Sequence, residues 1–155
     1  PKPIAYTPLG EAFVVGFFGL GAVGGVYYLH AFTLTGPVLA VGLAVGLIAA
    51  GVLMANNYRD MEPDRLAGRR TLVILAGPEL SKVLYGLFLV LPFALAFPPL
   101  GPKGGWVALG LLPFAFKLVR RFATEVRGPA FNQILAATAG YQLAFAGLLA
   151  VGSLL

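Results

Sequence analysis

The chain is organised as long apolar stretches separated by short polar clusters. No charged residue occurs between Glu11 and Arg59, and a run of turn-forming residues at 30–37 interrupts this stretch near its middle. A helix that crosses a bilayer needs about 20 mostly apolar residues. The stretch therefore predicts two membrane-crossing helices joined by a short turn.

The same criterion, applied to the rest of the chain, predicts three more crossings. The five predicted spans are residues 12–29, 32–55, 83–97, 106–119 and 131–154. The fourth span is short and needs Lys117 to reach outward to the interface, and we expect Pro92 and Pro113 to kink their helices. The predicted fold class is an all-α, integral membrane helix bundle with about five transmembrane helices, forming a single membrane domain over residues 1–155.

The composition agrees with this fold class and excludes several chemistries. Of 155 residues, 59% are apolar and 11% are charged, whereas a soluble domain has about 25% charged residues. The chain has no cysteine and one histidine, which excludes disulfides, thiolate metal sites, cysteine nucleophiles and multi-histidine metal sites. The net charge of +5 would suggest nucleic-acid binding in a soluble protein. In a membrane protein it indicates instead which loops lie on the cytoplasmic side, so we expect no nucleic-acid partner.

The basic residues predict which side of the membrane each loop occupies. With five crossings, ten of the eleven Lys and Arg residues, including Lys2, fall on one side, and Lys103 falls on the other. Cytoplasmic loops carry an excess of Lys and Arg, so we expect a multi-pass protein of the inner (plasma) membrane with its charged loops in the cytoplasm. Four crossings would scatter these charges over both sides. Because Pro1 is preceded by no Met and the first residues lack the features of a signal peptide, we expect further chain before it.

The most polar part of the sequence is residues 56–71, which we call the charged segment. Seven of its residues are charged, and burying them in hydrocarbon would cost on the order of 20 kcal/mol. We therefore expect it at the cytoplasmic mouth of the helices. Asp60 and Asp64 share a face if the backbone there is helical, and carboxylates are ligands that Mg²⁺ prefers.

Arginine binds phosphate oxygens through two parallel hydrogen bonds, so an acidic pair beside several arginines suits a diphosphate and its metal. The candidate phosphate and neutral ligands are Asn56, Asn57, Arg65, Arg69 and Arg70. A second interpretation remains open: Asp60 caps a short surface helix that has Pro63 in its first turn and Gly68 past its end. The arginines would then anchor the chain to acidic lipid headgroups.

The charged segment resembles the second aspartate-rich motif of the UbiA superfamily of membrane prenyltransferases, and it reads NNYRDMEPDR at 56–65 and GRRTL at 68–72. This form is similar to the subgroup of 1,4-dihydroxy-2-naphthoate polyprenyltransferases (the MenA type). Further similar pieces are LGE at 9–11, FFG at 17–19, FNQIL at 131–135, Thr138 and Gln142. The resemblance extends over essentially the whole chain.

The resemblance implies the C-terminal part of a nine-helix prenyltransferase fold. It implies Mg²⁺-dependent transfer of a polyprenyl group from polyprenyl diphosphate to 1,4-dihydroxy-2-naphthoate, with decarboxylation, in menaquinone biosynthesis. The family's first motif, of the Asn-Asp-x-x-Asp type, has no match in this sequence. We therefore expect these residues to be inactive alone and to need the preceding N-terminal helices as well as the lipid bilayer.

Residue by residue, the resemblance gives Asp60 and Asp64 the catalytic and metal-binding roles. The substrate-binding residues that it implies are Asn56, Asn57, Tyr58, Arg59, Arg65, Arg69, Arg70 and Asn132. Hydrogen bonding between helices is an equal alternative for Asn132. Two other functions stay open: a prenyltransferase for another aromatic acceptor, such as 4-hydroxybenzoate, and a non-catalytic membrane protein.

Overall fold

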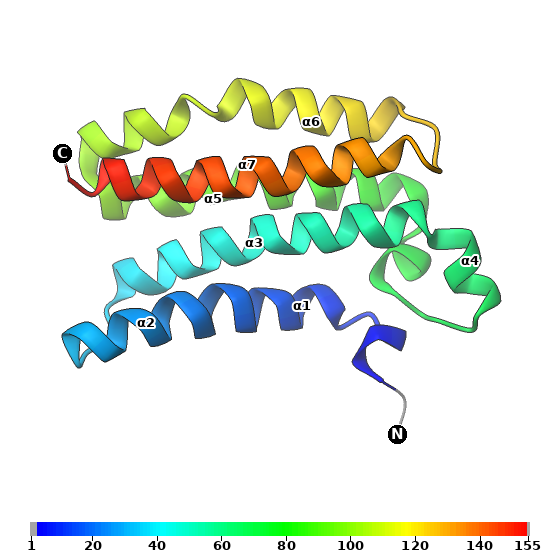
Figure 1. The fold of residues 1–155 in the computed structure, drawn as a ribbon, viewed down its shortest axis with the longest axis horizontal. Coiled ribbons are helices and arrows are strands. Elements are labelled where there is room, and N and C mark those ends of the chain that lie inside the picture. The colour runs from blue at the N-terminus through cyan, green and yellow to red at the C-terminus, as the bar shows by residue number, and fades with distance from the viewer. Residues whose placement is uncertain (1–2, 155) are drawn as a thin grey trace.

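The computed structural model describes residues 3–154, apart from the side chains of residues 5, 102 and 103, and all regular elements in this part are helical. The long helices follow one another in alternating directions and pack side by side (Figure 1). The elements are η1 (Ile4–Tyr6), α1 (Gly10–Val14), the π-helix η2 (Val15–Gly21), α2 (Ala22–Ala31), α3 (Gly36–Arg59), α4 (Met61–Leu66), α5 (Leu72–Leu109), α6 (Leu112–Thr124) and α7 (Phe131–Gly152). The all-α membrane bundle predicted from the sequence is confirmed.

Four helical stretches in the described part are long and apolar enough to cross a membrane. They are Gly10–Ala31, which joins α1, η2 and α2, then Gly36–Arg59, Leu72–Gly101 and Phe131–Gly152. They correspond to four of the five spans predicted from hydropathy.

The remaining predicted span, residues 106–119, is two shorter helical pieces. The last part of α5 ends at Leu109, and α6 begins at Leu112 with Pro113 in its first turn. Proline has no N–H and its ring crowds the preceding turn, so it is favoured at a helix start and disfavoured further inside. Together the two pieces carry the chain back to the α4 end of the bundle (Figure 1).

Two glycines interrupt α5. Gly77 has φ 74° and ψ 172°, and Gly101 has φ 69° and ψ −179°, a region of backbone space that is open essentially to glycine alone. Each glycine precedes a proline, which disfavours the helical conformation of the residue before it. The backbone at Pro92 stays helical, so the departures from helical geometry in α5 lie at these glycines and not at the predicted position.

α3 lies at the centre of the bundle, packed against η2, α5 and α7. Aromatic rings fill the space between α3, α5, α6 and α7, with the Tyr85 ring stacked on that of Phe122 at 3.9 Å between centroids. The hydroxyl of Thr138 donates to Ile134 O, so the Tyr85 hydroxyl donates to Thr138 Oγ1 at 2.7 Å. These buried polar groups are thus satisfied within the bundle.

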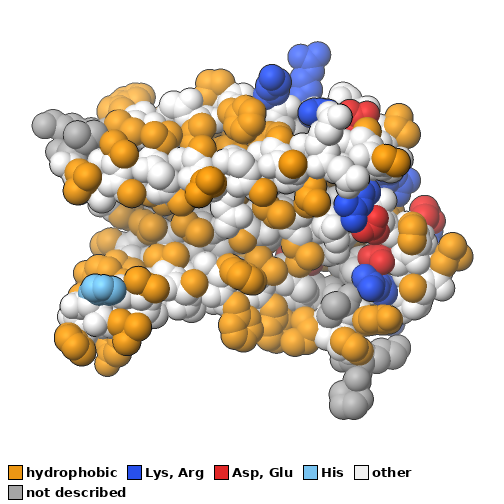
Figure 2. All heavy atoms as spheres, in the orientation of Figure 1, with side chains coloured by type: hydrophobic (Ala, Val, Ile, Leu, Met, Phe, Trp, Pro, Cys, Tyr) orange, Lys and Arg blue, Asp and Glu red, His pale blue; other side chains and the backbone are white. Residues whose placement is uncertain are grey.

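The two ends of the bundle differ in charge. η1, α4 and the α6–α7 turn lie at one end, and the α2–α3 turn and the bend at Gly101 lie at the other (Figure 1). On the face shown in Figure 2, charged side chains gather toward the α4 end, whereas hydrophobic groups and the histidine mark the opposite end. Lys2 and the side chain of Lys103, which also entered the charge count, lie outside the described part.

Candidate functional site

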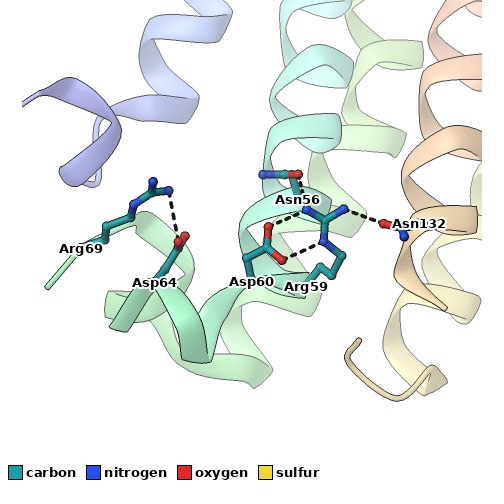
Figure 3. Close-up of polar contacts among 6 residues, drawn as sticks. All are labelled: Asn56, Arg59, Asp60, Asp64, Arg69 and Asn132. Carbon is teal, nitrogen blue, oxygen red and sulfur yellow. Dashed lines mark hydrogen bonds and ion pairs between the residues drawn. The ribbon is translucent and has the colours of Figure 1, made fainter. Parts of the chain in front are cut away.

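The two aspartates of the motif lie at the start of the short helix α4. Asp60 immediately precedes α4, and the Asp64 N–H donates to the Asp60 carbonyl oxygen at 2.9 Å, which closes one helical turn. As the spacing predicted, both carboxylates lie on one face, and they point back toward the long helices (Figure 3). Pro63 lies within α4 and Gly68, with φ 75°, follows its end, as expected for a short helix in this segment.

Arg59, the last residue of α3, holds the Asp60 side of the site together. Its Nε and Nη2 donate to the two Asp60 carboxylate oxygens at 2.8 and 2.6 Å. Nη2 also donates to Asn56 Oδ1 at 3.0 Å, and Nη1 donates to Asn132 Oδ1 of α7 at 2.6 Å (Figure 3). The hydrogen bonds from Arg59 lower the pKa of Asp60, so its carboxylate is ionised at neutral pH.

Arg69 makes the matching contact on the other side. Its Nη1 lies 3.1 Å from Asp64 Oδ1 (Figure 3), and its guanidinium carbon lies 5.1 Å from the centroid of the Tyr6 ring. The Arg70 N–H donates to the Tyr6 carbonyl oxygen at 3.0 Å. The segment after α4 is thereby attached to η1, and each motif aspartate has its own arginine partner.

This donor set fits a metal ion that is shared with a substrate. Within the described residues, no group of three or more His, Cys, Asp or Glu side chains lies close enough to form a protein-only metal site. Mg²⁺ is usually held by one or two carboxylates together with substrate phosphates and water. Asp60 and Asp64, on one face of α4 and beside two arginines, meet that requirement.

Two hollows meet beside this polar cluster. The first, which we call the apolar groove, has a volume of about 610 Å³ and runs between η2, α3 and α7, where Asn56 and Asn132 are among its few polar side chains. The second, which we call the inner pocket, has a volume of about 400 Å³ and lies between η1, α1, the end of α3 and residues 69–71. The three residues that line both hollows are Val14, Leu53 and Asn56.

The structure brings together some of the residues that the sequence singled out and separates others. Asn56, Arg59, Asp60 and Asn132 form one hydrogen-bonded cluster, with the Asp64 and Arg69 pair next to it (Figure 3).

The remaining predicted site residues lie around this cluster. Asn57 is buried and donates to Glu11. Tyr58 is 4% exposed and packs between Phe122 and Phe131 in the aromatic core, so its substrate contact stays a prediction. Arg65 and Arg70 are exposed, and within residues 3–154 their side chains have no hydrogen-bond or ion-pair partner.

Two residues near the site were not among the predicted site residues. Glu11, on α1, is 3% exposed, and its Oε1 accepts a hydrogen bond from Asn57 Nδ2 at 3.0 Å. Thr71, the residue before α5, is also 3% exposed and lines the inner pocket. The signal for Glu11 was in the sequence, because a lone acidic residue at the head of an apolar span is expensive to bury and is typical of a functional position.

Comparison with known proteins identifies the family to which the chain belongs. The profile of the UbiA prenyltransferase family matches residues 3–137, and the chain belongs to this family of membrane proteins. Among its relatives is a 1,4-dihydroxy-2-naphthoate octaprenyltransferase of Haemophilus influenzae, 39% identical over 88 residues, which cover 57% of this chain and 29% of the relative.

Two other relatives extend the match. The 1,4-dihydroxy-2-naphthoate octaprenyltransferase of Mycobacterium tuberculosis is 34% identical over 161 residues, covering 99% of this chain and 54% of the relative. The UbiA prenyltransferase domain-containing protein 1 of Rattus norvegicus is 39% identical over 141 residues, which cover 89% of this chain and 40% of the relative. The chain thus spans between about a third and a half of these relatives. No solved structure matched it significantly.

Proposed function

We propose that this chain supplies the metal- and diphosphate-binding part of a prenyltransferase that acts on 1,4-dihydroxy-2-naphthoate. The observation that carries the proposal is an acidic pair, with an arginine beside each carboxylate, at the mouth of an apolar groove. The names of the Haemophilus and Mycobacterium relatives favour this acceptor. The chain would act together with further helices, which carry the family's first motif.

In this proposal Asp60 and Asp64 are the residues that would hold Mg²⁺ beside the diphosphate of the substrate. When bound, the ion neutralises negative charge on the leaving diphosphate. The aspartates are paired with Arg59 and Arg69 in the structure, which compensates the charge of the buried Asp64 and of the partly exposed Asp60. Arg59 and Arg69, which lie beside these carboxylates, would also donate N–H groups to phosphate oxygens of the substrate.

The apolar groove would hold the isoprenoid chain. The carbon of this chain that is bonded to the diphosphate would lie near Asn56 and Asn132. The C–O bond of the diphosphate ester breaks, and the diphosphate leaves with the bonding electrons. The ring carbon that bears the carboxylate then attacks the allylic cation, and loss of CO₂ returns the electrons to the ring. The mostly apolar lining of the groove would keep water, which would otherwise trap the cation, away from the reacting carbon.

We also propose the orientation and extent that the sequence predicted. The α4 end, where the charged side chains gather, would face the cytoplasm of a cell whose plasma membrane holds the bundle. Residues 1–155 would form one membrane domain, which is part of a larger prenyltransferase domain.

The test uses the enzyme assembled from this chain and the segment that carries the family's first motif, which we call the assembled enzyme. Transfer from a polyprenyl diphosphate is measured with dihydroxynaphthoate or 4-hydroxybenzoate, in Mg²⁺ or in EDTA. We expect prenylated naphthoquinol and CO₂ from dihydroxynaphthoate in Mg²⁺ only. Transfer to 4-hydroxybenzoate alone would mean that the enzyme uses this acceptor and not dihydroxynaphthoate. A folded enzyme that prenylates neither compound would favour a non-catalytic role.

A further inference from the structure

α6 separates its apolar and polar residues onto opposite sides far more strongly than α2, α3, α5 or α7 do. Its buried residues are Ala115, Leu118 and Phe122, which follow one another at intervals of three and four positions and therefore share one face. That face packs into the bundle, where the Phe122 ring stacks on the Tyr85 ring. The opposite face, which we call the outer face of α6, is turned away from the other described helices.

The basic residues at 117–127 are of two kinds. Lys117 and Arg120 are exposed, and within residues 3–154 their side chains have no hydrogen-bond or ion-pair partner. The other two basic residues form ion pairs inside the protein, namely Arg121 Nε with Glu125 Oε2 at 3.7 Å and Arg127 Nη1 with Glu62 Oε1 at 3.8 Å. The bundle therefore leaves Lys117 and Arg120, three positions apart on the outer face, free to bind something else.

The outer face changes from apolar to basic along the helix. Its first exposed residues are Pro113 and Phe116, and the two unpaired cations follow them toward the α4 end. α6 ends at Thr124, so with a rise of 1.5 Å per residue Lys117 lies about 10 Å before this end. The two cations thus lie on the flank of the bundle and not in the loop beyond it. Figure 2 shows basic side chains projecting from the edge of the bundle along which α6 runs.

This order of residues matches the boundary between the acyl chains and the headgroups of a bilayer. Long basic side chains near the ends of membrane helices extend to the interface, where anionic headgroups attract them. Residues three positions apart on a helix are neighbours, so Lys117 and Arg120 can contact the same phosphate group. Arginine binds phosphate oxygens through two parallel hydrogen bonds, and lysine adds a compact positive charge.

We propose that the outer face of α6 binds an anionic phospholipid of the leaflet nearest the α4 end. Lys117 and Arg120 hold the phosphate, and Phe116 packs against an acyl chain. Charge selects an anionic headgroup, because a zwitterionic one brings a positive group close to the same two cations. A further apolar helix is a poor occupant of this face, because burying two unpaired cations is costly. The inference does not depend on the catalytic function proposed above.

The test follows the crosslinking of a photoreactive phosphatidylglycerol to the α6 peptide of the assembled enzyme in detergent, as the lipid concentration rises. Photoreactive phosphatidylcholine with the same acyl chains is the reference, and we expect it to need a higher concentration for half-saturation. Lys117→Gln combined with Arg120→Gln should raise the half-saturating concentration of phosphatidylglycerol about thirtyfold and leave that of phosphatidylcholine unchanged. Lys117→Arg combined with Arg120→Lys, which keeps both charges, should retain most of the affinity.

The matched control removes the same amount of positive charge from α5 and α6. It combines Lys82→Gln with Arg121→Gln, because both of these cations already form ion pairs within the protein, with Glu79 and Glu125 respectively. Since neither is free on the outer face of α6, the control should leave the half-saturating concentration of phosphatidylglycerol close to the wild-type value.

Several results would overturn the proposal. One is a Lys117→Gln and Arg120→Gln variant that binds phosphatidylglycerol as the wild type does. Another is an equal loss in the control, which would mean that the lipid responds only to the total charge of this region. Equal crosslinking of the two lipids would exclude selection by charge, and competition by free glycerol phosphate as strong as that by the lipid would indicate a phosphate site instead.

Absence of any crosslink at α6 in the assembled enzyme would mean that other helices cover the outer face, and the proposal would again be wrong. If thermal unfolding shows that the double variant does not fold, the single variants Lys117→Gln and Arg120→Gln decide. Each should then raise the half-saturating concentration of phosphatidylglycerol about fivefold, and no change in either would overturn the site.

Discussion

At the scale of single residues, Arg59 has more contacts at the site than the motif alone indicates. Its guanidinium joins α3 to Asp60 at the start of α4 and to Asn132 on α7. The resemblance implied a substrate-binding residue at this position, and the structure adds a bridge between residues that lie 73 positions apart in the chain. Such a bridge requires the planar fork of arginine, because lysine presents a single point of charge.

Arg59→Lys tests this bridge. It keeps the charge and loses the paired hydrogen bonds to Asp60, so we expect the KM for polyprenyl diphosphate to rise about tenfold or more in the assembled enzyme. Arg120→Lys, on the exposed side of α6, is the matched control and should leave the KM unchanged. A KM for Arg59→Lys equal to that of wild type would mean that charge alone matters at this position.

The residues of the site differ in how far the sequence could predict them. Asp60 and Asp64 are one helical turn apart, so their shared face follows from local geometry alone. The contact between Glu11 and Asn57 joins residues 46 positions apart, and it depends on how α1 packs against α3. Tyr58 is a neighbour of Asn57 in the motif, yet helical periodicity turns it into the aromatic core.

At the scale of elements, the first membrane helix approaches α3 through glycines. A methyl group at Gly19 would clash with the carbonyl oxygen of Gly42, and one at Gly46 would lie 2.9 Å from the carbonyl oxygen of Val15. Small residues allow this close backbone contact, which drives helix association in lipid. The contact also sets the position of α1, and hence of the wall shared by the two hollows.

Gly19→Ala is expected to weaken this packing. The added methyl group must displace backbone atoms, which costs about 1–3 kcal/mol, so the thermal unfolding temperature in detergent should fall. Gly25→Ala, in the same apolar stretch but with open space around it, should leave that temperature unchanged or raise it slightly, since alanine favours the helix. Equal unfolding temperatures for the two variants would argue against close contact at Gly19.

Hydropathy could predict the long helices and not their interruptions. The apolar stretches are long enough that no other structure satisfies their backbone groups in lipid. The breaks at Gly77, Gly101 and Gly110 depend on glycine and proline neighbours whose effect also varies with tertiary packing, which is why Pro92 was expected to kink a helix that continues through it. Composition alone does not separate these cases.

At the scale of the whole molecule, the membrane topology depends on the fourth predicted span, which the structure forms as two helical pieces. If residues 102–124 cross the membrane as two pieces, then η1, α4 and the α6–α7 turn share one side, as the bundle in Figure 1 places them at one end. That arrangement also gathers the charged side chains toward one end, as the basic residues of the sequence predicted.

Single cysteines test this topology directly, because the chain has none of its own. Three exposed positions outside the site are suitable, namely Thr33, Ala67 and Val126. A membrane-impermeant thiol reagent should label Ala67→Cys and Val126→Cys from the same face, and Thr33→Cys from the opposite face. Labelling of Val126→Cys together with Thr33→Cys would mean that residues 102–124 do not cross.

The proposed activity as a whole depends on the two aspartates of α4 and a divalent metal. Its most direct test is the rate of prenyl transfer by the assembled enzyme as a function of Mg²⁺ concentration. Asp60→Asn and Asp64→Asn should each lower the rate by about a hundredfold or more and shift the curve to higher Mg²⁺. Glu79→Gln, an exposed carboxylate near the start of α5, should match the wild type. Aspartate variants that keep both the wild-type rate and the wild-type Mg²⁺ dependence would contradict the assignment.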